Sequence, residues 1–155
     1  MMFSYRLVRL IETHADTLAE GLEKKVTASD SLPRFRTIPA HELRERVYEI
    51  YRHLGDWLLG KNQGDLERRY REIGARRAVQ KVPLPEVILA IVLTKGNLWD
   101  FLQSEAVADR AVEIMGEFEL LKMLEQFFDR AIYFAAVGYQ EEVERLKQES
   151  EVLAG

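Results

Sequence analysis

The segment IGARRAVQKVPLPEVILAIVLTK, Ile73–Lys95, contains a basic stretch, two closely spaced prolines and the longest apolar run of the chain. That run covers Val87–Leu93, far short of the roughly 20 residues that a helix needs to cross a bilayer. Proline is favoured in the first turn of a helix, as is an acidic residue, so Pro85 and Glu86 predict a helix start. The segment therefore predicts a buried helix after a basic turn, and no membrane span.

The rest of the chain has the same helical spacing, because apolar residues recur every three or four positions. Residues 28–40 hold two of the four prolines and predict a loop. No stretch shows the alternation of a strand, so the predicted fold class is all-α, a bundle of about five to six helices with a long C-terminal helix. Gly116 could break or bend that last helix. The expected helices cover residues 4–27, 40–58, 66–82, 85–103 and 107–146.

Composition and charge exclude several classes of protein. The chain has 155 residues, which fits one domain, and its net charge is −4 without a long run of one sign. A nucleic-acid-binding protein would need a concentrated basic face, so we expect no nucleic acid and no membrane as partners. The absence of cysteine removes disulfides and thiolate chemistry. The N-terminus does not have the pattern of a signal peptide, and we expect a cytoplasmic protein.

The last helix becomes polar on most of its faces after Tyr139, in the stretch QEEVERLKQESEVLAG. Only Val143, Leu146 and Leu153 form a narrow apolar stripe there. Such a helix either projects from its domain into solvent or pairs in a coiled coil. We therefore divide the chain into a domain, 1–142, and a helical extension or linker toward an output domain, 143–155.

No arrangement of side chains indicates catalysis. The three histidines, His14, His41 and His53, form no HxxxH or HExxH pair, so we expect no metal site. There is no GxSxG nucleophile elbow and no glycine-rich phosphate loop. We predict no catalytic residues, no enzymatic activity and no cofactor.

Arg77 is the most informative polar residue of the chain. It lies on the same helical stripe as the apolar Tyr70 and Ile73, which predicts that its side chain turns inward. An unpaired buried charge is costly, so the guanidinium must find a carboxylate, a carbonyl group or a bound anion.

The segment YREIGARRAVQKVPLPEVILAIVLTKGNLWDFL resembles the region of globin-coupled sensors that carries the haem-ligating histidine. In this comparison Ile73-Gly74 matches and Arg77 takes the place of that histidine. Together with LGDWL, LERRYREIGARR and RAIYFAAVGYQEE, over 54–142, it resembles the N-terminal sensor domains of RsbR- and RsbRD-type stressosome proteins. Those domains are non-haem relatives of the globin-coupled sensors.

The resemblance implies a globin-like bundle that forms a homodimer and signals through its last helix to a regulatory output of the stressosome or histidine-kinase type. Haem is not expected. By analogy with the haem cavity, a pocket for a small apolar ligand would be lined by Trp57, Tyr70, Ile73, Arg77, Val87, Ile91 and Trp99. Ordinary core packing is the alternative for the same side chains. The implied dimer interface consists of Leu121, Leu124, Phe128, Ala135 and Tyr139.

Three hypotheses about function follow. The first is a non-haem sensor domain that dimerises and transmits a signal. The alternative is a scaffold that dimerises and binds a partner protein without sensing a ligand. The third is a haem or tetrapyrrole sensor that uses His14 or His53 in place of the missing histidine.

Overall fold

The computed structural model describes residues 9–52, 54, 57, 63–105 and 111–154. Its elements are α2 (Ala15–Ala28), the short 3-10 helix η1 (Phe35–Thr37), α3 (Ala40–Arg52), α5 (Gln63–Val79), α6 (Leu84–Glu105) and α7 (Ala111–Ala154). No strand occurs in the part of the chain that is described. The prediction of an all-α fold with a long C-terminal helix is confirmed.

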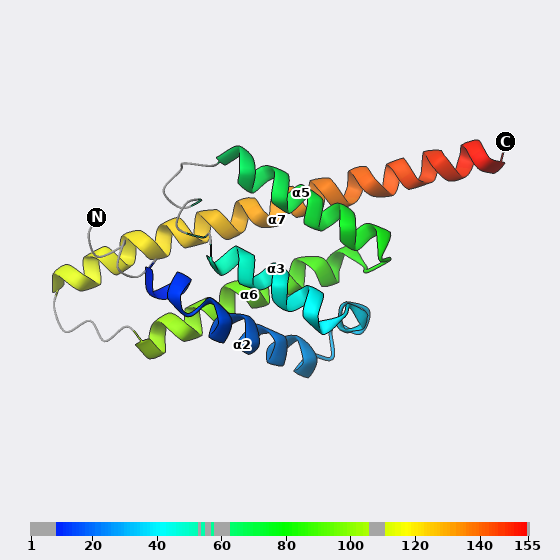
Figure 1. The fold of residues 1–155 in the computed structure, drawn as a ribbon. Helices are drawn as coiled ribbons and strands as arrows, with labels where there is room; N and C mark the ends of the chain where they lie inside the picture. The colour runs from blue at the N-terminus through cyan, green and yellow to red at the C-terminus, as the bar shows by residue number, and fades with distance from the viewer. Residues whose placement is uncertain (1–8, 53, 55–56, 58–62, 106–110, 155) are drawn as a thin grey trace.

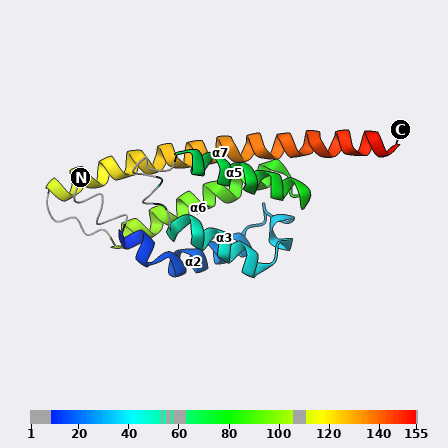
Figure 2. The ribbon, with the colours of Figure 1, turned by 45° about the horizontal axis from the view of Figure 1, so that its top comes forward.

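The helices form a layered bundle around α6 (Figures 1 and 2). α2 and α3 pack against each other on one side of α6, and α5 and α7 cross each other on the other side. α7 runs along the whole bundle and its last turns continue past every other helix (Figure 1). The C-terminal helix is therefore both a wall of the domain and its longest projection.

The helix predicted at Pro85 is confirmed as α6, and Val87 and Ile91 of its apolar run are buried. Glu86 in its first turn is also buried, and its Oε1 accepts the backbone N–H groups of Arg34 at 2.9 Å and Phe35 at 3.0 Å. This carboxylate satisfies N–H groups at the start of η1, an element missed in the predicted loop. Within the described ranges, no helix is long and apolar enough to cross a membrane.

Some helix boundaries differ from the sequence prediction; α5, for example, ends at Val79 and not at residue 82. The first predicted helix, 4–27, is interrupted at His14, which separates helical residues 9–13 from α2. The second, 40–58, gives α3 over Ala40–Arg52; Leu54 and Trp57 are also helical, and the other residues of 53–58 lie outside the described ranges. In contrast, α7 is helical through Gly116, so this glycine does not break it.

A buried polar network connects three helices inside the core. The Tyr51 hydroxyl of α3 donates to the Thr94 carbonyl of α6 at 2.9 Å. The amide nitrogen of Asn97 donates to the Leu18 carbonyl of α2 at 2.8 Å and to the Tyr51 hydroxyl at 3.4 Å. Because buried polar groups are costly unless they are paired, this network favours one arrangement of α2, α3 and α6.

α5 and α7 approach so closely that glycine is required at the crossing. A Cβ atom on Gly74 would lie 1.9 Å from the carbonyl oxygen of Ala135, and one on Gly138 would lie 2.1 Å from that of Arg71. Ala135 itself is fully buried. The two backbones are therefore in direct contact, which fixes where α7 crosses α5.

Candidate functional site

The C-terminus of α5 ends in a Schellman motif, in which two backbone hydrogen bonds close the helix. The N–H of Val82 donates to the Arg77 carbonyl at 3.0 Å, and that of Lys81 donates to the Ala78 carbonyl at 3.0 Å. Lys81 has a φ of 61°, the left-handed conformation that glycine usually supplies at this position. The basic turn of the sequence is thus a helix terminus in which a lysine carries the backbone strain.

Arg77 lies just inside that terminus and is buried, with 3% of its side chain exposed. Its Nη1 donates to Glu42 Oε1 at 3.3 Å and to Gln80 Oε1 at 2.7 Å. The guanidinium carbon also lies 5.4 Å from the centre of the Phe35 ring, within the range of a cation–π contact. Of the three partners left open by the sequence, the structure selects a carboxylate, supported by a side-chain amide.

Glu42 is shared by several cationic and amide groups at the start of α3. Its Oε1 accepts a hydrogen bond from Arg76 Nε at 2.5 Å and one from Gln80 Nε2 at 3.2 Å, besides that of Arg77. The hydrogen bond from Arg76 is the largest cause that lowers the pKa of Glu42, to about 2, and Arg77 adds to it. This cluster joins the first turn of α3 to the last turn of α5 and gives Arg77 a structural ion pair through its Nη1, whereas its buried Nε has no hydrogen-bond partner among the described residues.

The seven residues of the predicted pocket do not surround one cavity. Trp57, Tyr70 and Ile73 line a common space of about 20 Å³, which is little more than one water molecule occupies. Val87 and Ile91 are buried in the core, and Trp99 is half-buried on α6. For these residues the structure shows close packing in place of a haem-sized cavity.

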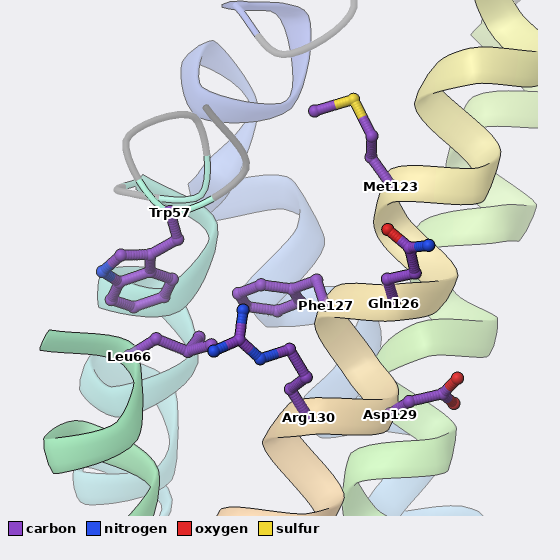
Figure 3. Close-up of a pocket in the computed structure, with 7 residues that line it drawn as sticks. All are labelled: Trp57, Leu66, Met123, Gln126, Phe127, Asp129 and Arg130. Carbon is purple, nitrogen blue, oxygen red and sulfur yellow. The ribbon is translucent and has the colours of Figure 1, made fainter. Parts of the chain in front are cut away.

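A larger pocket lies between α7, Trp57 and the start of α5 (Figure 3). It has a volume of about 310 Å³ and includes only Trp57 from the predicted set. Its other lining residues are Leu66, Met123, Gln126, Phe127, Asp129 and Arg130. The sequence prediction did not include these residues, because it placed no residue of the last helix in a pocket and assigned Phe128, and not Phe127, to the dimer interface. The spacing of Met123, Gln126, Phe127 and Arg130 places them on one helical face, a signal that was present in the sequence.

The aromatic side chains at this pocket are firmly held. The rings of Trp57 and Phe127 are stacked, with centres 5.7 Å apart and an interplanar angle of 15°, and both are almost fully buried. Trp57 Nε1 donates to Asp65 Oδ2 at 3.0 Å, and this hydrogen bond is the largest cause that lowers the pKa of Asp65. The indole therefore has its polar group satisfied on α5.

The residues predicted for the dimer interface differ in how far they are exposed in the chain itself. Leu124, Phe128 and Ala135 lie in the core of the chain itself, each with 1% or less of its surface exposed, so they present no surface to a second chain in this structure. Leu121 is half-buried, and so is Tyr139, whose hydroxyl donates to the Val82 carbonyl at 2.6 Å. The apolar stripe of α7 was recognised correctly, but α5 and other helices of the same chain cover much of it.

The two described histidines, His14 and His41, show no arrangement typical of a metal site. His14 Nδ1 lies 2.9 Å from the Leu10 carbonyl oxygen, and its ring centre is 5.5 Å from that of Phe101. His53 lies outside the described residues. Among the residues that the structure describes, no group of three or more histidine, aspartate or glutamate side chains is placed to hold a metal ion.

Residues 15–153 match the family model described as the RsbT co-antagonist protein rsbRD N-terminal domain. The chain belongs to this family. The match includes nearly all of the helices described above and extends into the segment 143–155. Searches of curated proteins and of solved structures gave no match. Membership confirms the resemblance to the RsbRD-type domains and associates the chain with stressosome regulation.

Proposed function

We propose that this chain is a cytoplasmic, non-haem and non-enzymatic signalling domain that forms a homodimer and passes a signal through α7 to a regulatory output. The observation that carries the proposal is the course of α7, which lines the bundle and then continues past it (Figure 1). A stimulus that changes how α7 packs in the bundle would also change the position of the C-terminal end of the same helix. Family membership supplies the regulatory context.

The contact of α5 with α7 supports this role. Gly74 and Gly138 place the backbones against each other, and the Tyr139 hydroxyl holds the carbonyl of Val82 just beyond α5. Arg71 of α5 also pairs with Glu141 of α7 at 3.5 Å. Since this contact lies where α7 leaves the bundle, the direction of the extension follows the position of α5.

The surface shared by α6 and α7 is the face that we assign to the homodimer. Val92 on α6 is 41% exposed, and Ile88 and Trp99 on the same helical face are half-buried. An ion pair between Lys95 and Glu125, 3.1 Å apart, brings this face of α6 beside α7. The adjoining residues of α7 that are apolar and incompletely buried are Leu121, Ile132, Ala136, Val143 and Leu146. These apolar residues of α7 therefore form a stripe that continues from the bundle into the extension 143–155.

The mass of the chain in solution tests this interface. We expect a dimer by light scattering, and we expect Val92→Glu to shift it toward the monomer because the charge would be buried between the copies. Val79→Glu is the matched control, since Val79 is a 56% exposed valine on α5, away from this face. A wild-type monomer would remove the dimer from the proposal, and a Val92→Glu dimer would remove this interface.

Cross-linking tests the path of the signal along the extension. The chain has no cysteine, so Ser150→Cys introduces a single thiol in line with Val143 and Leu146. If the extensions pair in parallel, this variant should form a covalent dimer on mild oxidation. The control is Gln148→Cys, two residues away and so about 200° around the helix. Equal cross-linking of both variants would argue against a paired extension.

The scaffold and haem hypotheses remain testable alternatives. A scaffold would dimerise and bind its partner without a ligand, and native mass spectrometry of fresh protein distinguishes it from a sensor that carries one. Arg77, which takes the place of the haem-ligating histidine of globin-coupled sensors, argues against haem. Its guanidinium is engaged with Glu42 and Gln80 and cannot ligate iron. A Soret band that shifts on haem addition would reverse that conclusion.

A further inference from the structure

We propose that the pocket between Trp57 and α7 binds a small molecule composed of an apolar ring system and one anionic group. This inference deepens the sensing role proposed above and rests on it. The volume of about 310 Å³ lies at the lower end of the range for small-molecule sites, so it suits a compact ligand and excludes a haem-sized one.

The floor of the pocket consists of apolar side chains, which favour an apolar part of the ligand. Trp57, Leu66 and Phe127 are each less than 5% exposed and present only carbon at the pocket, because the indole N–H is engaged by Asp65. The half-buried thioether of Met123 adds a polarizable side chain that packs well against rings. A flat hydrocarbon ring fits this floor better than a sugar or a peptide backbone, whose polar groups would lose hydrogen bonds there.

The rim of the pocket carries the cationic side chain of Arg130, which favours an anionic group on the ligand. In Figure 3 the guanidinium of Arg130 extends toward Phe127 and Leu66, whereas the carboxylate of Asp129 points away from the rings. The amide of Gln126 also borders the pocket, but in Figure 3 it lies on the other side of Phe127 from this guanidinium. A carboxylate or sulfonate placed beside Arg130 would receive hydrogen bonds from its guanidinium, whose planar fork matches the geometry of such anions. Arg130 is already engaged, with the Phe134 ring centre 5.9 Å from its guanidinium carbon among its contacts, so the anion would share this side chain with other groups.

The position of the pocket connects such a ligand to signalling. Five of the seven lining residues belong to α7, and Leu66 belongs to the first turns of α5. A ligand in the pocket touches both helices, and Phe127 also contacts Tyr70 of α5 with ring centres 6.0 Å apart. Binding therefore favours one position of α7 relative to α5, provided the ligand prefers that position.

Two dyes with the same aryl skeleton test the proposal on the purified whole chain. 8-Anilinonaphthalene-1-sulfonate carries an anionic group, and N-phenyl-1-naphthylamine is its neutral counterpart. We expect saturable binding of about one dye per chain by fluorescence titration, tighter for the sulfonate. Arg130→Gln should weaken binding of the sulfonate roughly tenfold and leave the neutral dye unchanged.

Filling the pocket tests its location. Met123→Trp should weaken binding of both dyes at least tenfold, and Gln126→Trp at the exposed rim is a second variant should the first fail to fold. Tyr133→Trp is the matched control, because Tyr133 is on the same helix and 63% exposed. If both filling variants leave dye binding unchanged, the proposed location of the site is wrong. If the two dyes bind equally well and Arg130→Gln weakens neither, the proposed anionic ligand class is wrong. A chain that dimerises and engages its output partner but binds neither dye would refute this pocket alone and leave the proposed function standing.

Discussion

Replacing Gly74 by alanine tests the contact that we consider decisive for the fold. The new Cβ atom would lie 1.9 Å from the Ala135 carbonyl oxygen and 2.8 Å from the Tyr139 nitrogen. An ordinary contact begins at about 3.4 Å, so α5 and α7 would have to separate by roughly 1.5 Å. Since both neighbours are backbone atoms, no rotamer change relieves the clash.

The expected free-energy change is the difference of two effects. Overpacking costs about 3 kcal/mol at a site that cannot adjust, and alanine regains about 1 kcal/mol of helix propensity. The net loss of about 2 kcal/mol in the free energy of unfolding corresponds to a melting temperature lower by roughly 4–8 °C for a chain of this size. Urea denaturation followed by circular dichroism, at one fixed protein concentration, measures it.

Gly96→Ala is the control within the same chain. Gly96 lies inside α6 and a Cβ atom there would meet nothing within 4 Å, so only the gain of about 1 kcal/mol in propensity should appear. A Gly74→Ala variant as stable as wild type or as Gly96→Ala would refute the close backbone contact, and with it the proposed transmission between α5 and α7.

Four further predictions concern the terminus of α5. Arg77→Ala should lower the free energy of unfolding by about 3 kcal/mol, since it breaks a buried ion pair; an unchanged melting temperature would show that the guanidinium is solvated. The pKa of Glu42 is depressed to about 2, so its stabilising effect is complete above pH 5 and is lost as the pH falls toward 2. The stability difference between wild type and Glu42→Gln should accordingly shrink over that range in acid titrations. Lys81→Gly should stabilise the chain by about 1 kcal/mol, because φ is 61° there. Tyr139→Phe should cost about 1 kcal/mol by removing the hydrogen bond to Val82, measured by denaturation as above.

The sequence was a good guide to local structure and to one unusual side chain. Apolar spacing predicted α5, α6 and α7, and the position of Arg77 on an apolar stripe predicted a buried guanidinium in need of a partner. Its partner Glu42 could not be predicted, because it belongs to another helix and lies among 26 acidic residues of the chain. Periodicity shows which face of a helix turns inward but not which charge it meets there.

The functional surfaces depended still more on tertiary packing. The sequence offered Phe127 and Phe128 as adjacent aromatic residues of one helix, and only the neighbouring helices decide their roles. Phe128 is 1% exposed and lies in the core, whereas Phe127 stacks on Trp57 at the pocket. Three residues predicted for the interface are therefore buried in the chain itself, and the pocket beside Trp57 is lined mainly by α7.

The sequence by itself determined an all-helical chain without cysteine, with a long polar-ended last helix and a family resemblance that the comparison confirmed. These properties follow from hydrophobic period, composition and local motifs, which need no knowledge of neighbours. Only the tertiary structure decided that Gly74 meets the backbone of α7, that Glu42 neutralises Arg77 and that a pocket opens beside Trp57. The physical reason is that close contact, ion pairing and cavity shape depend on distances between segments far apart in the chain.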